Sequence, residues 1–536
     1  MADEKVLLNT DQGSLQGIKT TSVYHGVPMF SFLGIPYAKP NIGKNKFQIS
    51  EAADSWTGPR DATKFKSSCV FYCMIKNEIV GDEDCLYLNV YTPDPSTDAK
   101  KAVIVFIHGG GYDTGSADDQ FYGADFFIEK DIVVVTLEYR LGAVGFINVG
   151  SDDGVANAGL KDQVLALKWI QNNIINFGGC PDRVTILGHN AGASSVQYHM
   201  LSPMSQGLFK SAIIQSGSFA CPWAISLTPK DDALMLATKL GITVKNTEDV
   251  MNKLKDISTK DIVKATMELM PTKNIFAGEM NIFAPSVEIN SGQNVFLSNN
   301  PWEIFKYGDV ADVPVIIGVT AQEAGIFTDV SLPIIQQLKS NYSIFIPKII
   351  NITDSKKIND ISDSIEKLYF NSRPVNQDTK NEITNLLSDV IFNHGTLLTA
   401  RMLSSRITSP VYEYLFNYNT TFGFIKNIFK STSSVHGDEL SYQFYSNIFN
   451  NKPVSGSPVA KKTDEILELW ANFAKEGDPS AKMDIVKLKW EPLGNDENYL
   501  DIGENLSMEK SIFKERMKFW AGLYKNLLGD YSKLFE

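Results

Sequence analysis

The stretch ILGHNAGASS, residues 186–195, joins a short apolar run to a run of small residues. This order is typical of a strand that turns sharply into a helix, because only small side chains fit where the two elements pack closely. Asn190 stands at the centre of the turn, where a positive φ is expected. Asn tolerates that conformation better than most residues other than Gly. We therefore expect a strand, a tight turn at Asn190 and a helix.

Strands and helices alternate on both sides of this turn. The apolar runs at residues 102–108, 131–139, 211–217 and 313–319 have the composition of strands that are buried on both faces. Residues 160–174 repeat apolar side chains every three or four positions, as a helix does. The alternation predicts an α/β fold with a mostly parallel central sheet and helices on both of its faces.

Two later regions, residues 225–310 and 330–405, are rich in helical patterns. We expect them to be insertions that form a helical cap over the carboxyl edge of the sheet, where open α/β sheets bind ligands. The chain has no internal repeat, low-complexity tract or long linker. It is therefore predicted to be a single domain over residues 1–536.

A glycine-rich run, HGGGY at residues 108–112, directly follows one of the predicted buried strands. Backbone N–H groups at this place can donate hydrogen bonds to a developing negative oxygen, as in an oxyanion hole. The N–H of Ala191, just after the turn, would be a further donor. A phosphate-binding loop is excluded, because no Lys followed by Ser or Thr comes after the glycines.

One of the six histidines is placed to act as a base. His436 lies in a polar loop after the last core strand, and Glu323 just past the strand at residues 313–319 is placed to be its acid partner. Ser216 lies on a neighbouring strand, near enough to hydrogen-bond behind the site, and Trp223 is placed to shape a pocket or to pack in the core. The other histidines fall in a hairpin region, the glycine loop, the turn and two predicted helices: His25, His108, His189, His199 and His394.

Motifs along almost the whole chain resemble those of the type-B carboxylesterases, the cholinesterase-like branch of the α/β-hydrolases. They are FLGIPYAKP (32–40), GDEDCLYLNVYTP (81–93), HGGGY, YRLGAVGF (139–146), NAGLKDQVLALKWIQNNIINFGG (157–179), QSGS (215–218) and VHGDEL (435–440). Within this family the chain most resembles insect esterases of the detoxifying kind.

The resemblance implies the α/β-hydrolase fold and hydrolysis of carboxylic esters by a Ser, a Glu and a His, with no metal and no cofactor. It places the acid at Glu323, the base at His436, and the oxyanion-hole donors at Gly110, Gly111 and Ala191. Hydrophobic small-molecule esters are the implied partners. The sequence does not indicate an oligomeric state.

Asn190 stands where the resemblance places the nucleophilic Ser. A Ser hydroxyl gives its proton to the His as it attacks, whereas the nitrogen lone pair of an Asn amide is delocalised. Ser194 and Ser195 lie about one helical turn further on and point elsewhere. We therefore predict a carboxylesterase homologue that is weakly active or inactive and that binds hydrophobic esters.

Three alternatives stay open for a chain with Asn190. It is an active ester hydrolase if this residue is an allele, a sequencing error or a deliberate knock-out. Deamidation would give an Asp nucleophile, although the following Ala191 makes that reaction slow. Finally, adhesion proteins of the same fold have lost their catalytic residues and bind partners, but they are usually anchored in a membrane.

Composition restricts the partners and the compartment. The net charge of −12 argues against a nucleic-acid binder, since no basic cluster is present to neutralise phosphates. No stretch approaches the roughly 18 consecutive apolar residues of a membrane span. The N-terminal segment lacks the basic and apolar parts of a secretory signal, which predicts a cytoplasmic protein, or a secreted one if a signal peptide was removed.

Three of the five cysteines, Cys69, Cys73 and Cys85, are close together in one loop. Free thiols are expected in a reducing compartment, and the alternative is a bridge from Cys85 to Cys69 or Cys73. Four asparagines fit the glycosylation sequon, an ordinary number for a chain this rich in Asn and Ser: Asn341, Asn351, Asn419 and Asn505.

Overall fold

The computed structural model describes residues 4–151, 155–244, 247–289, 294–337 and 341–535. The strands of its large sheet, in chain order, are β1 (Glu4–Thr10), β2 (Gly13–Thr21), β3 (Pro28–Pro36), β4 (Arg60–Asp61), β7 (Tyr87–Thr92), β8 (Lys101–Ile107), β9 (Val133–Leu137), β10 (Gly179–His189), β11 (Ser211–Gln215), β12 (Val315–Thr320), β13 (Val411–Phe416), β14 (Asn498–Ile502) and β15 (Leu506–Lys510). A separate hairpin consists of β5 (Phe71–Cys73) and β6 (Glu78–Val80).

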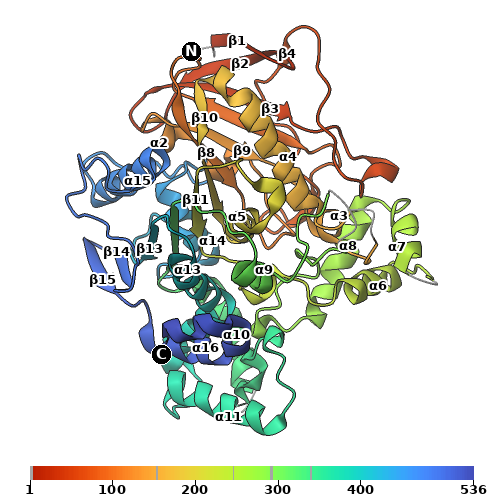
Figure 1. Ribbon diagram of the computed structural model, residues 1–536, viewed down its shortest axis with the longest axis vertical. Coiled ribbons are helices and arrows are strands. Elements are labelled where there is room, and N and C mark those ends of the chain that lie inside the picture. The colour runs from red at the N-terminus through yellow and green to blue at the C-terminus, as the bar shows by residue number, and fades with distance from the viewer. Residues whose placement is uncertain (1–3, 152–154, 245–246, 290–293, 338–340, 536) are drawn as a thin grey trace.

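The helices surround the sheet (Figure 1). They are α1 (Asp119–Tyr122), α2 (Asp125–Ile128), α3 (Gly142–Phe146), α4 (Ala158–Asn173), α5 (Ala191–Leu201), α6 (Pro229–Lys239), α7 (Thr247–Leu254), α8 (Thr259–Leu269), α9 (Pro301–Tyr307), α10 (Thr328–Gln337), α11 (Ser355–Ile365), α12 (Lys380–Ser388), α13 (His394–Arg406), α14 (Phe424–Phe429), α15 (Pro458–Glu476), α16 (Lys514–Leu523) and α17 (Lys525–Leu528).

The spatial order of the sheet is β1-β2-β3-β7-β9-β8-β10-β11-β12-β13-β14-β15, with β4 paired to β2. All neighbours from β9 to β14 are parallel. Antiparallel pairs add β1, β2, β3 and β7 at one edge and β15 at the other. The predicted mostly parallel centre is confirmed, and antiparallel strands extend it on both sides.

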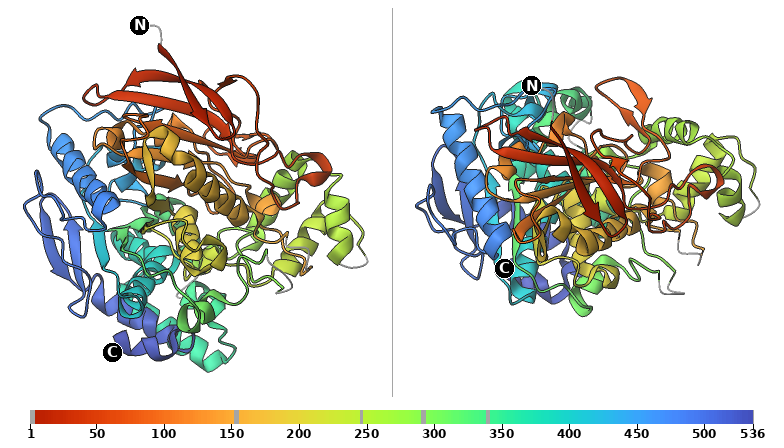
Figure 2. Two further views of the ribbon diagram at one scale, coloured as in Figure 1. Left: turned by 45° about the horizontal axis from the view of Figure 1, so that its top comes forward. Right: turned by 90° about the horizontal axis from the view of Figure 1, so that it is seen from above.

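The central strands bury both of their faces. Along β8, Val103 and Val105 face one apolar cluster, and Ile104 and Phe106 face the other. The first cluster includes residues of α4, and the second includes residues of α2 and α15. Figures 1 and 2 show α4 and α15 on opposite sides of the strands. This confirms the helices on both faces, and it explains why these strands are continuous apolar runs instead of alternating ones.

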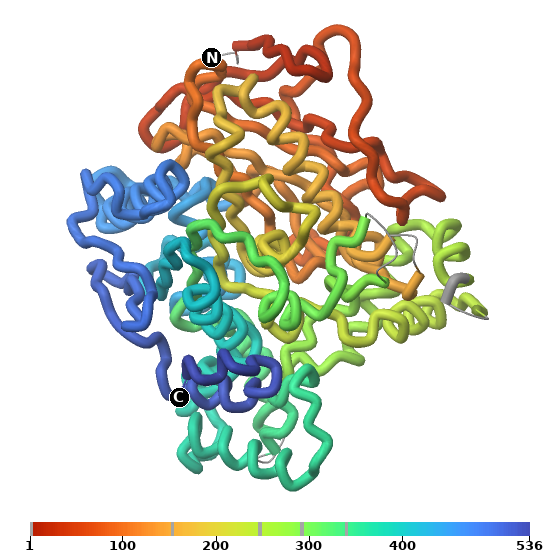
Figure 3. The backbone as a smooth tube through the Cα atoms, in the orientation of Figure 1, coloured from red at the N-terminus to blue at the C-terminus, as the bar shows by residue number. Residues whose placement is uncertain are grey.

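The two regions expected to form insertions contain helices separated by irregular segments. Residues 225–310 contain α6, α7, α8 and α9, and residues 330–405 contain α11, α12 and most of α10 and α13. Figure 3 shows the stretch around α11 at the end of the molecule opposite the N-terminal strands. Helix α13 packs against β12 and β13, so part of the second region covers the sheet itself.

A disulfide joins Cys69 and Cys85, whose Cα atoms are 4.8 Å apart. The expectation of free thiols is therefore wrong for this pair. The alternative, a bridge from Cys85 to Cys69 or Cys73, is confirmed with Cys69 as the partner. The β5–β6 hairpin explains the pairing, because it turns the chain back so that the amide of Asp82 donates to the carbonyl of Ser68 at 3.0 Å. Cys73, at the end of β5, has a free thiol.

Candidate active site

Asn190 forms the turn between β10 and α5, with φ 56° and ψ −119°. The strand, turn and helix expected at this place are confirmed, and the conformation is one that residues other than Gly rarely adopt. Its amide donates to the carbonyl of Gln215 at 2.9 Å. A Cβ atom on Gly109 would lie only 2.8 Å from the Cβ of Asn190, so glycine is required where the glycine loop passes the turn.

The glycine loop presents two backbone amides to the side chain of Asn190. Gly110 and Gly111 donate to its Oδ1 at 3.1 and 2.9 Å. Both glycines have a positive φ, at 113° and 62°, which lets the loop turn its N–H groups inward. Ala191, the third donor that the sequence predicts, is the first residue of α5, directly after Asn190.

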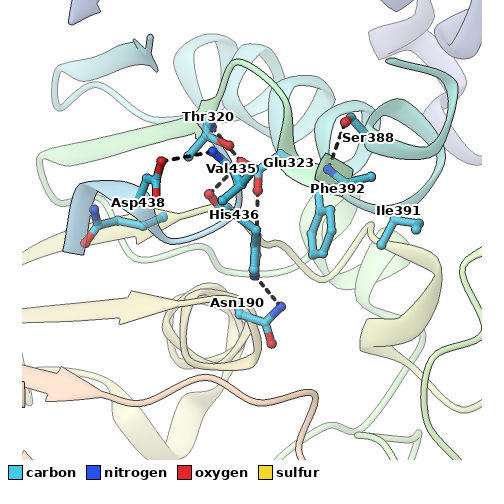
Figure 4. Close-up of polar contacts among 12 residues, drawn as sticks. Asn190, Thr320, Glu323, Ser388, Ile391, Phe392, Val435, His436 and Asp438 are labelled. Carbon is cyan, nitrogen blue, oxygen red and sulfur yellow. Dashed lines mark hydrogen bonds and ion pairs between the residues drawn. The ribbon is translucent and has the colours of Figure 1, made fainter. Parts of the chain in front are cut away.

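The acid and base candidates meet at the same point. His436 Nδ1 lies 2.5 Å from Oε2 of Glu323, and His436 Nε2 lies 2.9 Å from Nδ2 of Asn190 (Figure 4). Glu323 begins the short 3-10 helix that follows β12, and His436 lies in the loop after α14. The structure thus brings Asn190, His436 and Glu323 into one hydrogen-bonded chain, although they are far apart in the sequence.

Glu323 is completely buried and firmly held. Its Oε1 accepts hydrogen bonds from the hydroxyl of Ser216 at 2.7 Å and from the amide of Thr320 at 2.6 Å. The neighbouring amide of Ala324 donates to the hydroxyl of Ser388 (Figure 4). Ser216 therefore lies behind the site, as expected, and the carboxylate is oriented by contacts that do not involve residue 190.

The ring of His436 lies between two other rings. Phe392 stacks on it with centroids 4.2 Å apart, and His189 lies on another side at 4.4 Å. Burial, and secondly the neighbouring His436 imidazole, hold the pKa of His189 well below its usual range, so His189 is neutral. The indole of Trp223 donates to the carbonyl of Ile391 at 2.8 Å, next to Phe392. Trp223 is thus buried against the site, with its ring 6.1 Å from that of Phe392.

Two further residues at the site, Phe392 and Asn281, have no signal in the sequence. Phe392 belongs to a π-helical turn, residues 389–393, at the start of α13. Asn281 lies in an irregular part of the region at residues 225–310, and its side-chain amide donates to the carbonyls of Gly111 and Trp223 at 2.9 and 3.0 Å. It links the glycine loop to the wall of the site.

The other histidines have structural partners. On α5, His199 bonds to Ser205 and Gln163, and burial lowers its pKa to about 3. On α13, His394 donates to the carbonyl of Asp389, and burial lowers its pKa to about 4. Both lie on helices, as predicted.

In the described ranges of the chain, no group of three or more His, Cys, Asp or Glu side chains is arranged to hold a metal ion. Among the helices of those ranges, none combines the length and the apolar character needed to cross a bilayer.

Known proteins resemble this chain over nearly its full length. The family model described as "Carboxylesterase family" matches residues 4–520. Esterase E4 of Myzus persicae is 34% identical over 507 residues, which cover 90% of this chain and 86% of that protein. Juvenile hormone esterase of Tribolium castaneum is 30% identical over 551 residues, covering 95% and 91% of the two chains.

A solved structure agrees with these sequence matches. The crystal structure of juvenile hormone esterase from Manduca sexta, with OTFP covalently attached, matches with a TM-score of 0.85 and 26% identity. The match covers 97% of this chain and 100% of that one.

Proposed function

Because this chain belongs to the carboxylesterase family and has the α/β-hydrolase fold, we propose that it is a carboxylesterase homologue with little or no turnover of carboxylic esters. One observation carries the proposal: the group that faces His436 is the carboxamide of Asn190, at 2.9 Å, in the place where the family's nucleophilic hydroxyl is expected.

The chemical reason is the difference between a hydroxyl and an amide. An attacking Ser hydroxyl transfers its proton to the His and bonds to the acyl carbon, but the amide nitrogen of Asn has no available lone pair. In a well-studied serine protease, removal of the nucleophile lowers kcat by on the order of 10⁶. That loss corresponds to roughly 8 kcal/mol of activation free energy. A comparable loss is proposed for this chain.

The other residues keep the roles that the family assigns to them. We propose His436 as the base and Glu323 as the carboxylate that orients it, in agreement with their 2.5 Å contact. Gly110, Gly111 and Ala191 are proposed as oxyanion-hole donors, and no metal or cofactor takes part.

The ligand is proposed to be a hydrophobic carboxylic ester. The two relatives named above, Esterase E4 and a juvenile hormone esterase, support this class. We further propose that the chain is one domain, in which residues 225–310 and 330–405 form the cap that shapes the ligand site.

The Cys69–Cys85 disulfide is evidence about the cellular compartment in which the protein resides. Disulfides persist in oxidising environments and are rare in the cytosol. This bridge therefore argues against the cytoplasmic location that the N-terminal sequence suggests. We propose an oxidising compartment, as for a secreted protein.

The experiment compares the natural chain with Asn190→Ser. Hydrolysis of 4-nitrophenyl butyrate is followed by absorbance. In parallel, both proteins are treated with diethyl 4-nitrophenyl phosphate, and their intact masses are measured by mass spectrometry. The natural chain is expected to hydrolyse the ester near the background rate and to form no adduct. The Ser variant should gain several orders of magnitude in rate and one diethylphosphoryl group.

The double variant Asn190→Ser, His436→Ala is the control, and it should lose the gained activity. Rapid hydrolysis or a phosphoryl adduct in the natural chain, confirmed as Asn190 by peptide sequencing, would overturn the proposal.

A further inference from the structure

The hydrogen bonds around Asn190 show that its side chain fills the place where an ester carbonyl would bind. Backbone N–H groups can only donate, so the acceptor facing Gly110 and Gly111 must be the amide oxygen, Oδ1. The orientation of the carboxamide therefore follows from the network itself. Its Nδ2 points to His436.

The same network uses the ring nitrogens of His436. An amide nitrogen only donates, so Nε2 of His436 accepts from Asn190. The ring proton then lies on Nδ1, which donates to Glu323. Asn190 thus engages two amides of the glycine loop and the lone pair with which His436 would take a proton.

The main chain keeps the side chain in this position. The amide of Asn190 donates to Gln215 and its carbonyl accepts from Ser194 at 3.0 Å, which anchors the turn on both sides. Gly109 passes so closely that its Cβ, if present, would be 2.8 Å from the Cβ of Asn190. The carboxamide is therefore confined between the glycine loop and His436.

We propose that the side chain of Asn190 occupies the oxyanion hole and blocks it. This effect adds to the absence of a nucleophilic hydroxyl. This inference rests on the proposed function. A bound ester could replace Oδ1 with its carbonyl oxygen, but it brings no donor for Nε2 of His436. Displacement of the carboxamide therefore leaves the histidine unsatisfied, and the natural chain binds esters without contacting their carbonyl group.

The proposal predicts that a shorter residue 190 turns the site into a hydrolase that uses water. In Asn190→Gly the carbonyl oxygen of an ester can accept from Gly110 and Gly111, and a water can donate to Nε2 of His436. The water oxygen bonds to the acyl carbon while its proton moves to Nε2, and the carbonyl electron pair moves onto the oxygen in the hole. As that pair returns, the bond to the alcohol oxygen breaks and Nε2 gives its proton to the alkoxide. Ester and water thus become acid and alcohol.

The same substitution suits the backbone. Glycine adopts the φ of 56° at position 190 without the steric penalty of a side chain. The variant is therefore expected to fold, and its thermal melting and circular dichroism verify this. Asn190→Ala, which also opens the hole, is the second variant, because it does not change the flexibility of the chain as much.

The test measures kcat/KM for 4-nitrophenyl butyrate in the natural chain, Asn190→Gly, Asn190→Ala and Asn190→Ser. Shortening residue 190 should raise kcat/KM at least about ten-fold above that of the natural chain. This gain lies within the rate enhancement of about 10³–10⁴ over water that an oxyanion hole and substrate binding supply without a nucleophile. The gain should disappear when His436→Ala is added to Asn190→Gly.

Two results would count against the proposal, and they differ. If Asn190→Ser is active while the folded Gly and Ala variants are no faster than the natural chain, the blocked hole is refuted and the proposed function stands. If the natural chain matches Asn190→Ser, the proposed function fails and this inference fails with it.

Discussion

The side-chain amide of Asn281 donates a hydrogen bond to the carbonyl of Gly111 at 2.9 Å and, in addition, to that of Trp223 at 3.0 Å. Asn281 is only 7% exposed. Asn281→Leu, which is similar in size, leaves the buried carbonyl of Trp223 and the half-buried carbonyl of Gly111 without this donor. We expect the free energy of unfolding to fall by about 1–3 kcal/mol in urea denaturation.

Asn252, on the exposed side of α7, provides the matched control. Asn252→Leu should change the free energy of unfolding by less than about 0.5 kcal/mol. Equal losses of unfolding free energy in the two variants would show that the hydrogen bonds of Asn281 do not stabilise the fold.

The same contact should affect catalysis once a nucleophile is present. In the Asn190→Ser background, Asn281→Leu frees the loop that carries Gly110 and Gly111, and loss of a single oxyanion-hole donor lowers kcat by about 10²–10³ in a serine protease. A displaced loop should lower kcat at least about ten-fold in steady-state assays and leave KM nearly unchanged. A rise in KM at constant kcat would instead assign Asn281 to ester binding.

Behind the glycine loop, burial raises the pKa of Glu138 to about 8 and lowers that of His108 to about 4. The unfolded Glu titrates near 4.5, so between about pH 4.5 and 8 the folded chain keeps a proton that the unfolded chain has released. The free energy of unfolding should therefore fall as the pH rises through this window, with a slope from this group of up to about 1.4 kcal/mol per pH unit.

Glu138→Gln tests this dependence, because it resembles the protonated acid and does not ionise. Urea unfolding at pH 6, 7 and 8 should give a shallower decline for this variant than for the natural chain. The exposed Glu515 offers a control, and Glu515→Gln should keep the natural slope. An unchanged slope in Glu138→Gln would mean that Glu138 is ionised in the folded chain.

The Cys69–Cys85 bridge closes a loop with a sequence separation of 16. A loop of about this length restricts the unfolded chain by roughly 3 kcal/mol. The double variant Cys69→Ala, Cys85→Ala should therefore lower the free energy of unfolding by about that amount. Cys73→Ala is the control, since its thiol is free and its loss should have little effect. A peptide map without reduction that links Cys85 to Cys73 would contradict this pairing.

Residues that follow buried strands could be predicted well. Buried strands appear as continuous apolar runs, so their ends can be located, and Glu323 comes directly after one of them. His436 could be found because so few histidines are available. The turn at Asn190 was predictable because the small residues around it indicate close packing.

Contacts made between distant loops could not be predicted. Asn281 and Phe392 reach the site from irregular and π-helical segments, which have no periodic pattern. The choice of Cys69 over Cys73 depends on a short hairpin that closes the loop. The contact of Oδ1 of Asn190 with the glycine amides depends on side-chain geometry, which residue spacing does not encode.

The hydrogen bonds that orient Glu323 come from Ser216 and Thr320, so this half of the site does not depend on which residue stands at position 190. Both Asn codons become Ser codons through one base change. A gene that encodes Asn190 can therefore gain the hydroxyl in a single mutational step, without any change in the contacts that orient Glu323. Loss of ester hydrolysis in such a lineage is therefore inherited, but one further mutation can reverse it.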